Sequence, residues 1–380
     1  MTRKSNRGPD PSELTLRMLC ANAAGRCQFE GCNKPVFFDG LTLREFNKSN
    51  VAHIVSSSSS GPRGDVLRSH QLSDKLCNLM LLCPDHHKLI DDFPNSYPEA
   101  DLLEMKRKHE EAIATQCGLI YKEPSEVLMV SSPIKGRTPV TVNFNQCADA
   151  VMPEKRVASV RGQRIKVEIE EDYHSPGYWE SAVRALNRRF GLTVSAILEE
   201  DPNAHFSVFP LAPMPLIMKL GYMIGDKARA DVFQFSRACD SWNWSTKEQT
   251  NSFSAKKQVV RDGGRIALVF SLTADIATTR ITEVYDADIL YFIRAARFGV
   301  DCIQSPADLA AFWSIYQSTC DEIKNTYPEV QKIGVFPAMP VSAAFEVGRR
   351  YMPGVYPRFR IYDDDNGFFE TITIGGKEND

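Results

Sequence analysis

Residues 81–91 read LLCPDHHKLID, and two adjacent histidines in this stretch, His86 and His87, raise the first question about the chain. Neighbouring side chains on a helix point about 100° apart, because a helix has about 3.6 residues per turn. The two histidines therefore cannot easily serve one site, but they can serve two. Cys83 stands three residues before His86, which is the first hint of a metal site.

A second pair of cysteines points to zinc. Cys27 and Cys32 flank a small turn, RCQFEGC, some fifty residues before Cys83. Zinc prefers four ligands in a tetrahedron, and two short pairs from distant segments are a common way to supply them. The loop-rich stretch between the pairs could hardly bury enough apolar surface by itself, so a metal would stabilise it. We predict a structural zinc site formed by Cys27, Cys32, Cys83 and His86, with two buried thiols at Cys27 and Cys32 as the alternative.

Composition describes an ordinary globular protein. The 380 residues are 43% hydrophobic and 24% charged, and the length allows two or three domains. We expect a cytoplasmic protein, because the start lacks a signal peptide, no apolar run could span a membrane, and ten cysteines fit a reducing compartment. The net charge of −3 offers no global attraction for nucleic acid, so any DNA contact needs a local patch.

Helix signals and turn residues divide the chain. A first helix is expected from a Ser12 cap to a stop at Gly25, and a second from Pro98, capped by Ser96 or Tyr97, to Gly118. Turn signals follow from residue 122 to residue 139. We predict an N-terminal domain over residues 1–122 and a C-terminal domain over residues 123–380.

The C-terminal part contains a repeat. VFPLAPMPLIMKLG (208–221) aligns without gaps with VFPAMPVSAAFEVG (335–348), and the same offset of 127 pairs VFQF (232–235) with FRIY (359–362). Each copy is typical of a strand, a Pro-rich loop, a helix and a strand, which favours parallel α/β sheets. We predict a pseudo-twofold sensor domain with halves at about 150–262 and 263–380; chance similarity of two α/β units is the alternative.

The second histidine of the opening stretch suggests catalysis. NVAHIV is typical of a short strand that ends near His53, and NLMLLCPDHH places Asn78 before a second strand and His87 on a helix. On a ββα unit around a divalent metal, a strand histidine can take a proton from water while the metal stabilises charge on a phosphate. An unperturbed histidine pKa near about 6.5 suits such a base.

These motifs, together with Cys27 and Cys32, resemble the HNH (ββα-metal) nuclease motif in its zinc-stapled subset, over about residues 12–117. The resemblance implies that His53 is the general base, that Asn78 fixes the loop, and that His87 binds a catalytic divalent metal such as Mg²⁺. Many HNH nucleases have an aspartate directly before the base, where this chain has Ala52. The second metal ligand therefore stays open between three candidates, Asp65, Asp74 and Asp91.

Several basic residues of this region could hold DNA. Lys106, Arg107 and Lys108 are expected on the wet face of a helix, and with Arg63 and Arg68 they could contact phosphates. The serine run at 56–60 is expected to form a flexible loop.

The sensor part offers a ligand site at the ends of its strands. Ligands of parallel sheets collect at the carboxyl ends of the strands, where both VFP loops lie and where Pro340 and Ser342 lead into a helix. Ser271 and Thr273 end the buried strand of RIALVFSLTADI (265–276). In DSWNWS (240–245), two tryptophans on one side of a strand could stack on a purine, although a core position is the plain alternative. These are Trp242 and Trp244.

KIGVFPAMPVSAAFEVGRR, LVFSLT and FRIYD resemble the SAVED domain, which is built from two fused CARF-like, Rossmann-type units, over about residues 125–380. The expected fold class is thus α+β, with a zinc-stapled ββα domain, followed by α/β. SAVED domains bind cyclic oligonucleotides made by a partner nucleotidyltransferase. HNH joined to SAVED resembles an effector of bacterial CBASS antiphage defence. The resemblance implies a dormant nuclease that forms a homo-oligomer on binding a cyclic di- or trinucleotide and then degrades double-stranded DNA with little sequence specificity.

Two other functions remain open at this point. A zinc-stapled DNA-binding regulator with a nucleotide sensor and no catalysis would explain Ala52. A modification-dependent restriction nuclease would use the C-terminal half to read modified bases, although a tandem α/β repeat favours a small nucleotide.

Overall fold

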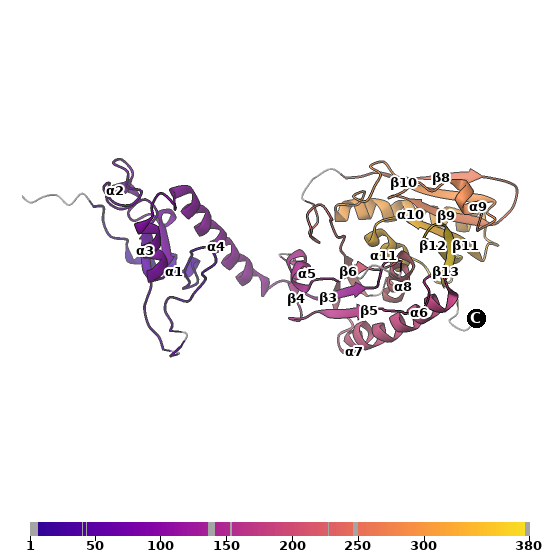
Figure 1. Cartoon of the computed structure of the whole chain (residues 1–380), viewed down its shortest axis with the longest axis horizontal. Coiled ribbons are helices and arrows are strands. Elements are labelled where there is room, and N and C mark those ends of the chain that lie inside the picture. Colours follow the sequence, from indigo (N-terminus) through magenta and orange to yellow (C-terminus); the bar gives the residue numbers. More distant parts are fainter. Residues whose placement is uncertain are drawn as a thin grey trace, which may run out of the picture. The chain divides into compact units, whose positions relative to one another are not determined.

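The computed structural model describes residues 7–39, 41–42, 44–135, 141–152, 154–226, 228–245 and 250–376. The chain forms two compact units, Met1–Tyr121 and Lys122–Asp380 (Figure 1). No helix in the described ranges is both long and apolar enough to cross a membrane.

The N-terminal unit is α+β, as predicted. Its elements are α1 (Glu13–Asn22), β1 (Asn50–His53), α2 (Ser69–Leu72), a 3-10 turn η1 (Leu76–Asn78), β2 (Leu79–Leu82), α3 (Pro84–Asp92) and α4 (Glu99–Leu119). Ser12 caps α1 as expected, because its side chain accepts a hydrogen bond from the Thr15 N–H. Helix α4 begins after Pro98, which has no side-chain acceptor, so the predicted cap at Ser96 or Tyr97 is wrong.

The ββα unit of the N-terminal half positions its site. Strands β1 and β2 pair antiparallel, with His53 opposite Leu79. Cys83 follows β2 and is the N-cap residue of α3, and Pro84 opens the helix with a backbone angle that suits its first turn. Helix α3 carries both His86, the predicted zinc ligand, and His87, the predicted ligand of the catalytic metal.

The C-terminal unit is α/β, and its described residues form two sheets. The first sheet is built from β3 (Pro124–Ser131), β4 (Arg156–Val157), β5 (Gln163–Lys166), β6 (His205–Leu211) and β7 (Arg229–Val232). The second is built from β8 (Phe253–Val259), β9 (Ile266–Ser271), β10 (Ile289–Ala295), β11 (Lys332–Ala338), β12 (Arg358–Asp364) and β13 (Phe368–Ile374). The helical elements are α5 (Phe144–Val151), α6 (Pro176–Phe190), the π-helical η2 (Gly191–Ser195), α7 (Ala196–Glu200), α8 (Met214–Ile224), α9 (Thr278–Thr282), α10 (Pro306–Thr326) and α11 (Val341–Arg349).

The two sheets differ at their edges. The first has the order β4-β3-β6-β7, with β5 also paired to β3, and all its pairings are parallel. The second has the order β13-β12-β11-β9-β10-β8, with parallel inner pairs and antiparallel edge strands β13 and β8. The first half thus begins at β3, before the expected start at about 150, and β8 belongs to the second half rather than the first.

The repeat has a counterpart in three dimensions. Its copies are β6-α8-β7 and β11-α11-β12, although β7 ends at Val232, where the expected strand VFQF begins. A Cβ added to Gly221 of α8 would collide with the backbone of Phe345, and one added to Gly348 of α11 would collide with the backbone of Met218. The offset of 127 relates Gly221 to Gly348 and Met218 to Phe345. The α8–α11 contact is therefore reciprocal, which places a pseudo-twofold axis between these two helices.

Candidate functional site

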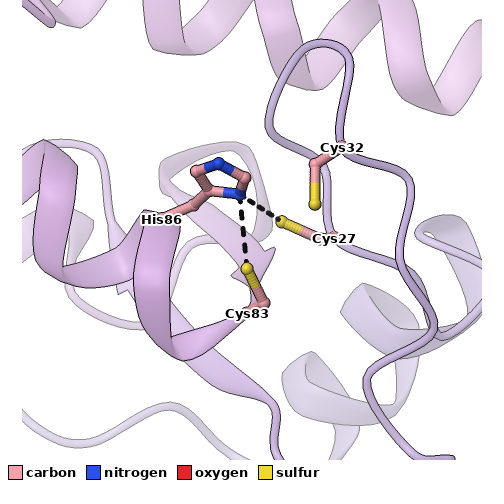
Figure 2. Close-up of side chains that lie close together, drawn as sticks. All are labelled: Cys27, Cys32, Cys83 and His86. Carbon is pink, nitrogen blue, oxygen red and sulfur yellow. Dashed lines mark hydrogen bonds between the residues drawn. The ribbon is translucent and has the colours of Figure 1, made fainter. Parts of the chain in front are cut away.

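The four predicted zinc ligands come together in the N-terminal unit. The ligand atoms of Cys27, Cys32, Cys83 and His86 all lie within 4.8 Å of one another (Figure 2). His86 Nδ1 lies 3.6 Å from the Cys27 sulfur and 3.3 Å from the Cys83 sulfur. Nitrogen and sulfur ligands at tetrahedral positions around one zinc ion would be about 3.6 Å apart. The cluster therefore has the donor set and the dimensions of a zinc site.

Two further features suit this site to a metal. The imidazole of His86 stacks on Phe29 with 4.1 Å between ring centroids, so its ring plane is fixed. Burial raises the pKa of the Cys27 thiol to about 12. Such a thiol ionises at neutral pH only when a cation offsets the cost of the buried charge. All four positions of the tetrahedron are taken by protein side chains, as in structural rather than catalytic zinc sites.

His53 lies at the end of β1 with one ring nitrogen engaged. Its Nε2 donates a hydrogen bond to the Ser73 carbonyl oxygen at 3.0 Å. A neutral imidazole carries one proton, so this contact leaves Nδ1 as an acceptor. Burial lowers the pKa of His53, and the backbone carbonyl of Ser73 only partly opposes that effect. The side chain is thus neutral at pH 7 and available as a base.

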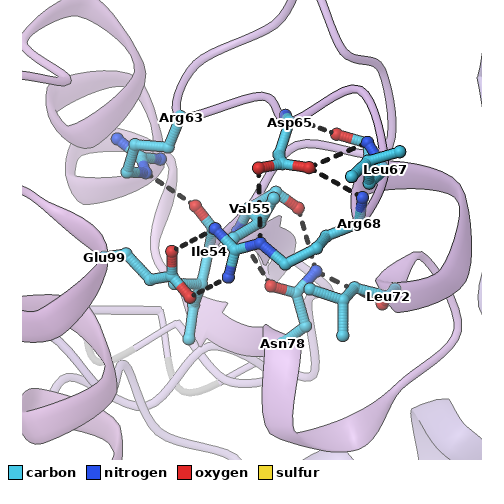
Figure 3. A network of polar contacts seen from close by, with 10 residues as sticks. Ile54, Val55, Arg63, Asp65, Leu67, Arg68, Leu72, Asn78 and Glu99 are labelled. Carbon is cyan, nitrogen blue, oxygen red and sulfur yellow. Dashed lines mark hydrogen bonds and ion pairs between the residues drawn. The ribbon is translucent and has the colours of Figure 1, made fainter.

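Asn78 fixes the chain directly after His53. Its side-chain oxygen accepts from the Val55 N–H at 2.8 Å, and its amide donates to the Val55 carbonyl at 2.9 Å (Figure 3). The amide also donates to the Leu72 carbonyl at 3.2 Å, and the Asn78 carbonyl accepts from Ile54 at 2.8 Å. Only 3% of Asn78 is exposed, so these bonds are shielded from water. They set where β1 ends and hence where His53 points.

His87 has one carboxylate partner among the three candidates. Asp91 lies one turn further along α3, and its Oδ2 is 3.8 Å from His87 Nε2. Neighbouring ligands at about 2.1 Å from an octahedral ion lie about 3.0 Å apart, so a small side-chain rotation would let these two atoms share a metal. The side chains are 33% and 37% exposed, which leaves room for water and substrate. The negative charge of Asp91 is close enough to the His53 ring to favour its protonated form slightly. This small effect opposes the dominant lowering of the His53 pKa by burial.

The other two carboxylate candidates have other partners. Asp65 accepts from the N–H groups of Leu67 and Arg68, and Asp74 accepts from the N–H of Ser12. These backbone hydrogen bonds hold the pKa of each carboxyl below its usual range. Ala52 is 1% exposed and belongs to the core of the unit. The position before His53 therefore supplies packing, and Asp91 is the carboxylate next to the predicted metal ligand.

The basic residues expected to contact phosphates are mostly engaged within the unit. Lys106 is buried against Glu110, and Arg107 binds Glu104 and Glu111. Arg68 forms two bonds of 2.9 Å to Glu99 (Figure 3). The Arg63 side chain is only 7% exposed. Lys106 therefore does not lie on the solvated helix face expected for it, and the phosphate contact considered for this set stays a prediction.

A cavity of about 370 Å³ opens where the two repeat copies meet. The Pro-rich loops of both copies line it, with Leu211–Met214 from the first and Pro337–Val341 from the second. The offset of 127 relates Leu211 to Ala338 and Met214 to Val341, so the cavity lies on the pseudo-twofold axis. A second cavity of about 600 Å³ shares the lining residues Gln234, Phe235 and Asp301 with it.

The predicted ligand residues have different places around these cavities. Thr273 and Pro340 line the first cavity, and Trp244 lines the second. Ser271 is 1% exposed, where its hydroxyl accepts from the Ile276 N–H at 3.3 Å. Ser342 is fully buried, where its hydroxyl donates to the Gln234 side chain at 2.9 Å.

The tryptophan segment differs from its prediction. Residues 240–245 form no regular strand, so the expected arrangement of two tryptophans on one strand face is wrong. Trp242 is 1% exposed and packs edge-on against Phe209 and Phe235 in a hydrophobic cluster. It occupies the core position that the sequence left as its alternative, and Trp244 is only half-buried.

Comparisons with known families agree with this division. A family model described as HNH endonuclease matches residues 27–94. A second family model matches residues 191–374. This is the SAVED model, described as "SMODS-associated and fused to various effectors sensor domain". The chain joins an HNH endonuclease domain to a SAVED domain. Among curated protein sequences, none matches it.

Solved structures of SAVED proteins give a more distant likeness. The Cap4 SAVED/CARF-domain containing receptor of Acinetobacter baumannii, with the cyclic trinucleotide 2'3'3'-cAAA, is 12% identical with a TM-score of 0.42. The Moraxella osloensis receptor of that name is 12% identical with a TM-score of 0.37. Each match covers 81% of this chain, which spans 66% of the first structure and 60% of the second.

Sequence reasoning missed polar residues of the SAVED cavity. Arg237, Asp363 and Tyr173 line it, and Tyr173 donates a hydrogen bond to Asp363. Burial raises the pKa of Asp363 above its usual range. The acidic run FRIYDDD at the end of the second repeat could have signalled this carboxylate. Tyr173 and Arg237 lie outside the aligned repeat, and no local motif marks them.

Proposed function

We propose that this chain is a metal-dependent nuclease whose HNH domain hydrolyses double-stranded DNA after the SAVED domain binds a cyclic oligonucleotide, as an effector of CBASS antiphage defence. The arrangement of His53, Asn78, His87 and Asp91 on one ββα unit carries this proposal. It provides a neutral base, a brace for that base and a partly exposed pair of metal ligands.

His53 begins the reaction by accepting a proton from water at Nδ1. The hydrogen bond from Nε2 to Ser73 holds the ring and leaves that nitrogen free. His87 and Asp91 would hold a divalent cation such as Mg²⁺, which stabilises charge on the scissile phosphate and leaving group. Asn78 maintains the position of His53 through the adjoining backbone.

The rival DNA-binding regulator is less favoured by this geometry. A structural zinc site alone would explain Cys27, Cys32, Cys83 and His86. It would not explain a neutral histidine with a free Nδ1 within electrostatic reach of Asp91. Asp91 also offers a second metal ligand, which removes the main reason that Ala52 gave for a non-catalytic protein.

The SAVED cavity suits a cyclic oligonucleotide. A ring of repeated nucleotides presents similar groups on opposite sides, and the cavity presents related loops from both repeat copies. Arg237 adds a cation for a phosphate, and Thr273 adds a hydroxyl. The adjoining cavity extends the available volume, so a cyclic di- or trinucleotide is the ligand class that we propose.

Ligand binding would act by assembling copies of the chain. Many basic residues of the HNH domain are already paired with acidic ones, so one domain should hold DNA weakly. Two active sites on one duplex gain from effective concentration. The ligand must then bind the assembled state more tightly than the resting one.

Plasmid digestion with Mg²⁺ and a panel of cyclic di- and trinucleotides tests the proposal. We expect degradation of unmodified plasmid only with an activating nucleotide, together with a rise in molar mass by light scattering. Binding without cleavage would favour the regulator. Cleavage restricted to modified DNA, without a nucleotide, would favour the restriction enzyme. Full activation at unchanged mass would rule out assembly.

A further inference from the structure

Arg63 is a buried cation beside the proposed active site. Its guanidinium donates from Nε to the Ile54 carbonyl and from Nη1 to the Ile90 carbonyl, both at 2.7 Å. Nη2 lies 3.4 Å from Asp91 Oδ1. Figure 3 shows the side chain reaching the Ile54 carbonyl directly after β1. One planar group thus joins the end of β1 to the second half of α3.

The loop that presents Arg63 is tightly built. Arg63 has φ of 53°, a left-handed conformation that non-glycine residues seldom adopt. The next residue is Gly64, whose added Cβ would lie 2.5 Å from the Ser58 carbonyl oxygen and 2.6 Å from that of Ser59. The serine run expected to be a loose loop therefore packs against this turn. A strained residue persists where its surroundings fix it, and such residues are common at functional sites.

The contacts divide the two oxygens of Asp91 between two partners. Oδ1 faces Arg63, and Oδ2 faces Nε2 of His87 at 3.8 Å. The Ile54 carbonyl held by Arg63 belongs to the residue that follows His53. Arg63 therefore contacts the Asp91 carboxylate and also bridges α3 to the residue that follows β1.

We propose that Arg63 is a positioning residue that orients Asp91 toward the metal shared with His87 and sets its distance from His53. This inference rests on the proposed nuclease function. Residues that hydrogen-bond to a metal ligand, without touching the metal, orient that ligand. Mutation of such a residue typically lowers metal affinity about 10–100-fold. Lysine cannot replace Arg63 here, because one ammonium group lacks the planar fork that reaches Ile54, Ile90 and Asp91 together.

The test compares Arg63→Lys with Arg68→Lys in the zinc-loaded full-length chain. Both changes keep the charge, and Arg68 contacts Glu99 and Asp65 rather than Asp91. Calorimetric titration with Mn²⁺ should show binding weakened about 10–100-fold in Arg63→Lys and unchanged in Arg68→Lys. The zinc content should stay at one ion per chain in both. The Mg²⁺ concentration for half-maximal plasmid cleavage should rise by a similar factor only in Arg63→Lys.

A double-mutant cycle separates positioning from general support. If Arg63 acts through Asp91, the double variant Arg63→Lys/Asp91→Asn should bind Mn²⁺ no more weakly than Asp91→Asn alone. Additive losses, an Mn²⁺ affinity in Arg63→Lys within twofold of the parent, or loss of zinc together with Mn²⁺ would each overturn the inference. Unchanged Mn²⁺ binding in Asp91→Asn would instead overturn the proposed metal site itself.

Discussion

The HNH and SAVED domains reach stability by different routes. The described part of the HNH domain has a main core of 13 buried hydrophobic residues, and two of these are the predicted zinc ligands Cys27 and Cys83. The largest core of the SAVED domain runs through both sheets and the helices between them, from Leu128 to Ile374. The smaller domain thus places predicted metal ligands within its core, whereas the larger one has a core of apolar packing alone. Mutations should therefore separate the two domains cleanly.

The largest expected effect is the loss of zinc. His86→Ala removes one of four ligands, and structural zinc contributes about 10–16 kcal/mol in zinc-finger peptides. We expect the HNH domain to lose zinc and to unfold at a lower temperature, while the SAVED domain melts as before. Elemental analysis and calorimetric melting of the full chain measure both outcomes.

His87→Ala is the matched control for His86→Ala. The two residues are neighbours on α3, but only His86 lies in the zinc cluster. The control should keep zinc and the fold while losing cleavage. Zinc retained by His86→Ala and lost by His87→Ala would show that the two roles are reversed.

The next effect concerns catalysis alone. His53→Ala removes the proposed proton acceptor but no zinc ligand, so cleavage should fall about 10²–10⁴-fold. Zinc content and cyclic-nucleotide binding should match the parent protein. His70→Ala, an exposed histidine of α2, serves as the control and should cleave normally. Parental cleavage rates in His53→Ala would remove this histidine from the mechanism.

The contrast between the domains also explains what the sequence could predict. Metal ligands belong to few residue types at short spacings, so Cys27, Cys32, Cys83 and His86 could be predicted as one cluster from local motifs. The structure brings them together. The repeat predicted the α/β architecture of the SAVED domain. Its offset of 127 also relates Gly221 to Gly348, and these two glycines lie at equivalent places in the α8–α11 contact.

Long-range packing decided what the sequence could not. Asp91 was one of three candidates for the second metal ligand. It differs from Asp65 because it lies one turn after His87 and directs Oδ2 toward that side chain, whereas Asp65 accepts from backbone N–H groups. In the sequence, Arg63 resembled a phosphate ligand. Its burial could not be predicted, because it depends on the carbonyl groups of Ile54 and Ile90, which only the fold brings to it. In the sequence, Trp242 resembled a stacking surface for a base, but in the structure Phe209 and Phe235 pack against it. Charge and aromaticity are visible in a sequence, but burial is a property of the fold.

A smaller effect is expected from the helix crossing in the SAVED domain. Gly348→Ala places a Cβ against the Met218 backbone, and overpacking typically costs about 1–3 kcal/mol. The SAVED transition should move to lower temperature while the HNH domain keeps its zinc. Gly191→Ala is the control, because an added Cβ there meets no atom within 4 Å. Equal stability of the two variants would mean that α8 and α11 separate without cost.

The smallest effect concerns pH and the electrostatics of the HNH domain. Burial lowers the pKa of His53 below 6.5, and the hydrogen bond to Ser73 opposes this shift only in part. A base works in its neutral form, and the fraction of neutral His53 is more than half at any pH above its pKa. At saturating Mg²⁺ and activating nucleotide, single-turnover cleavage should therefore fall less than about twofold between pH 7.5 and 6.5, and steeply only below that range. A several-fold loss within that interval would show that His53 titrates above 6.5, and that burial does not control its charge in the active complex.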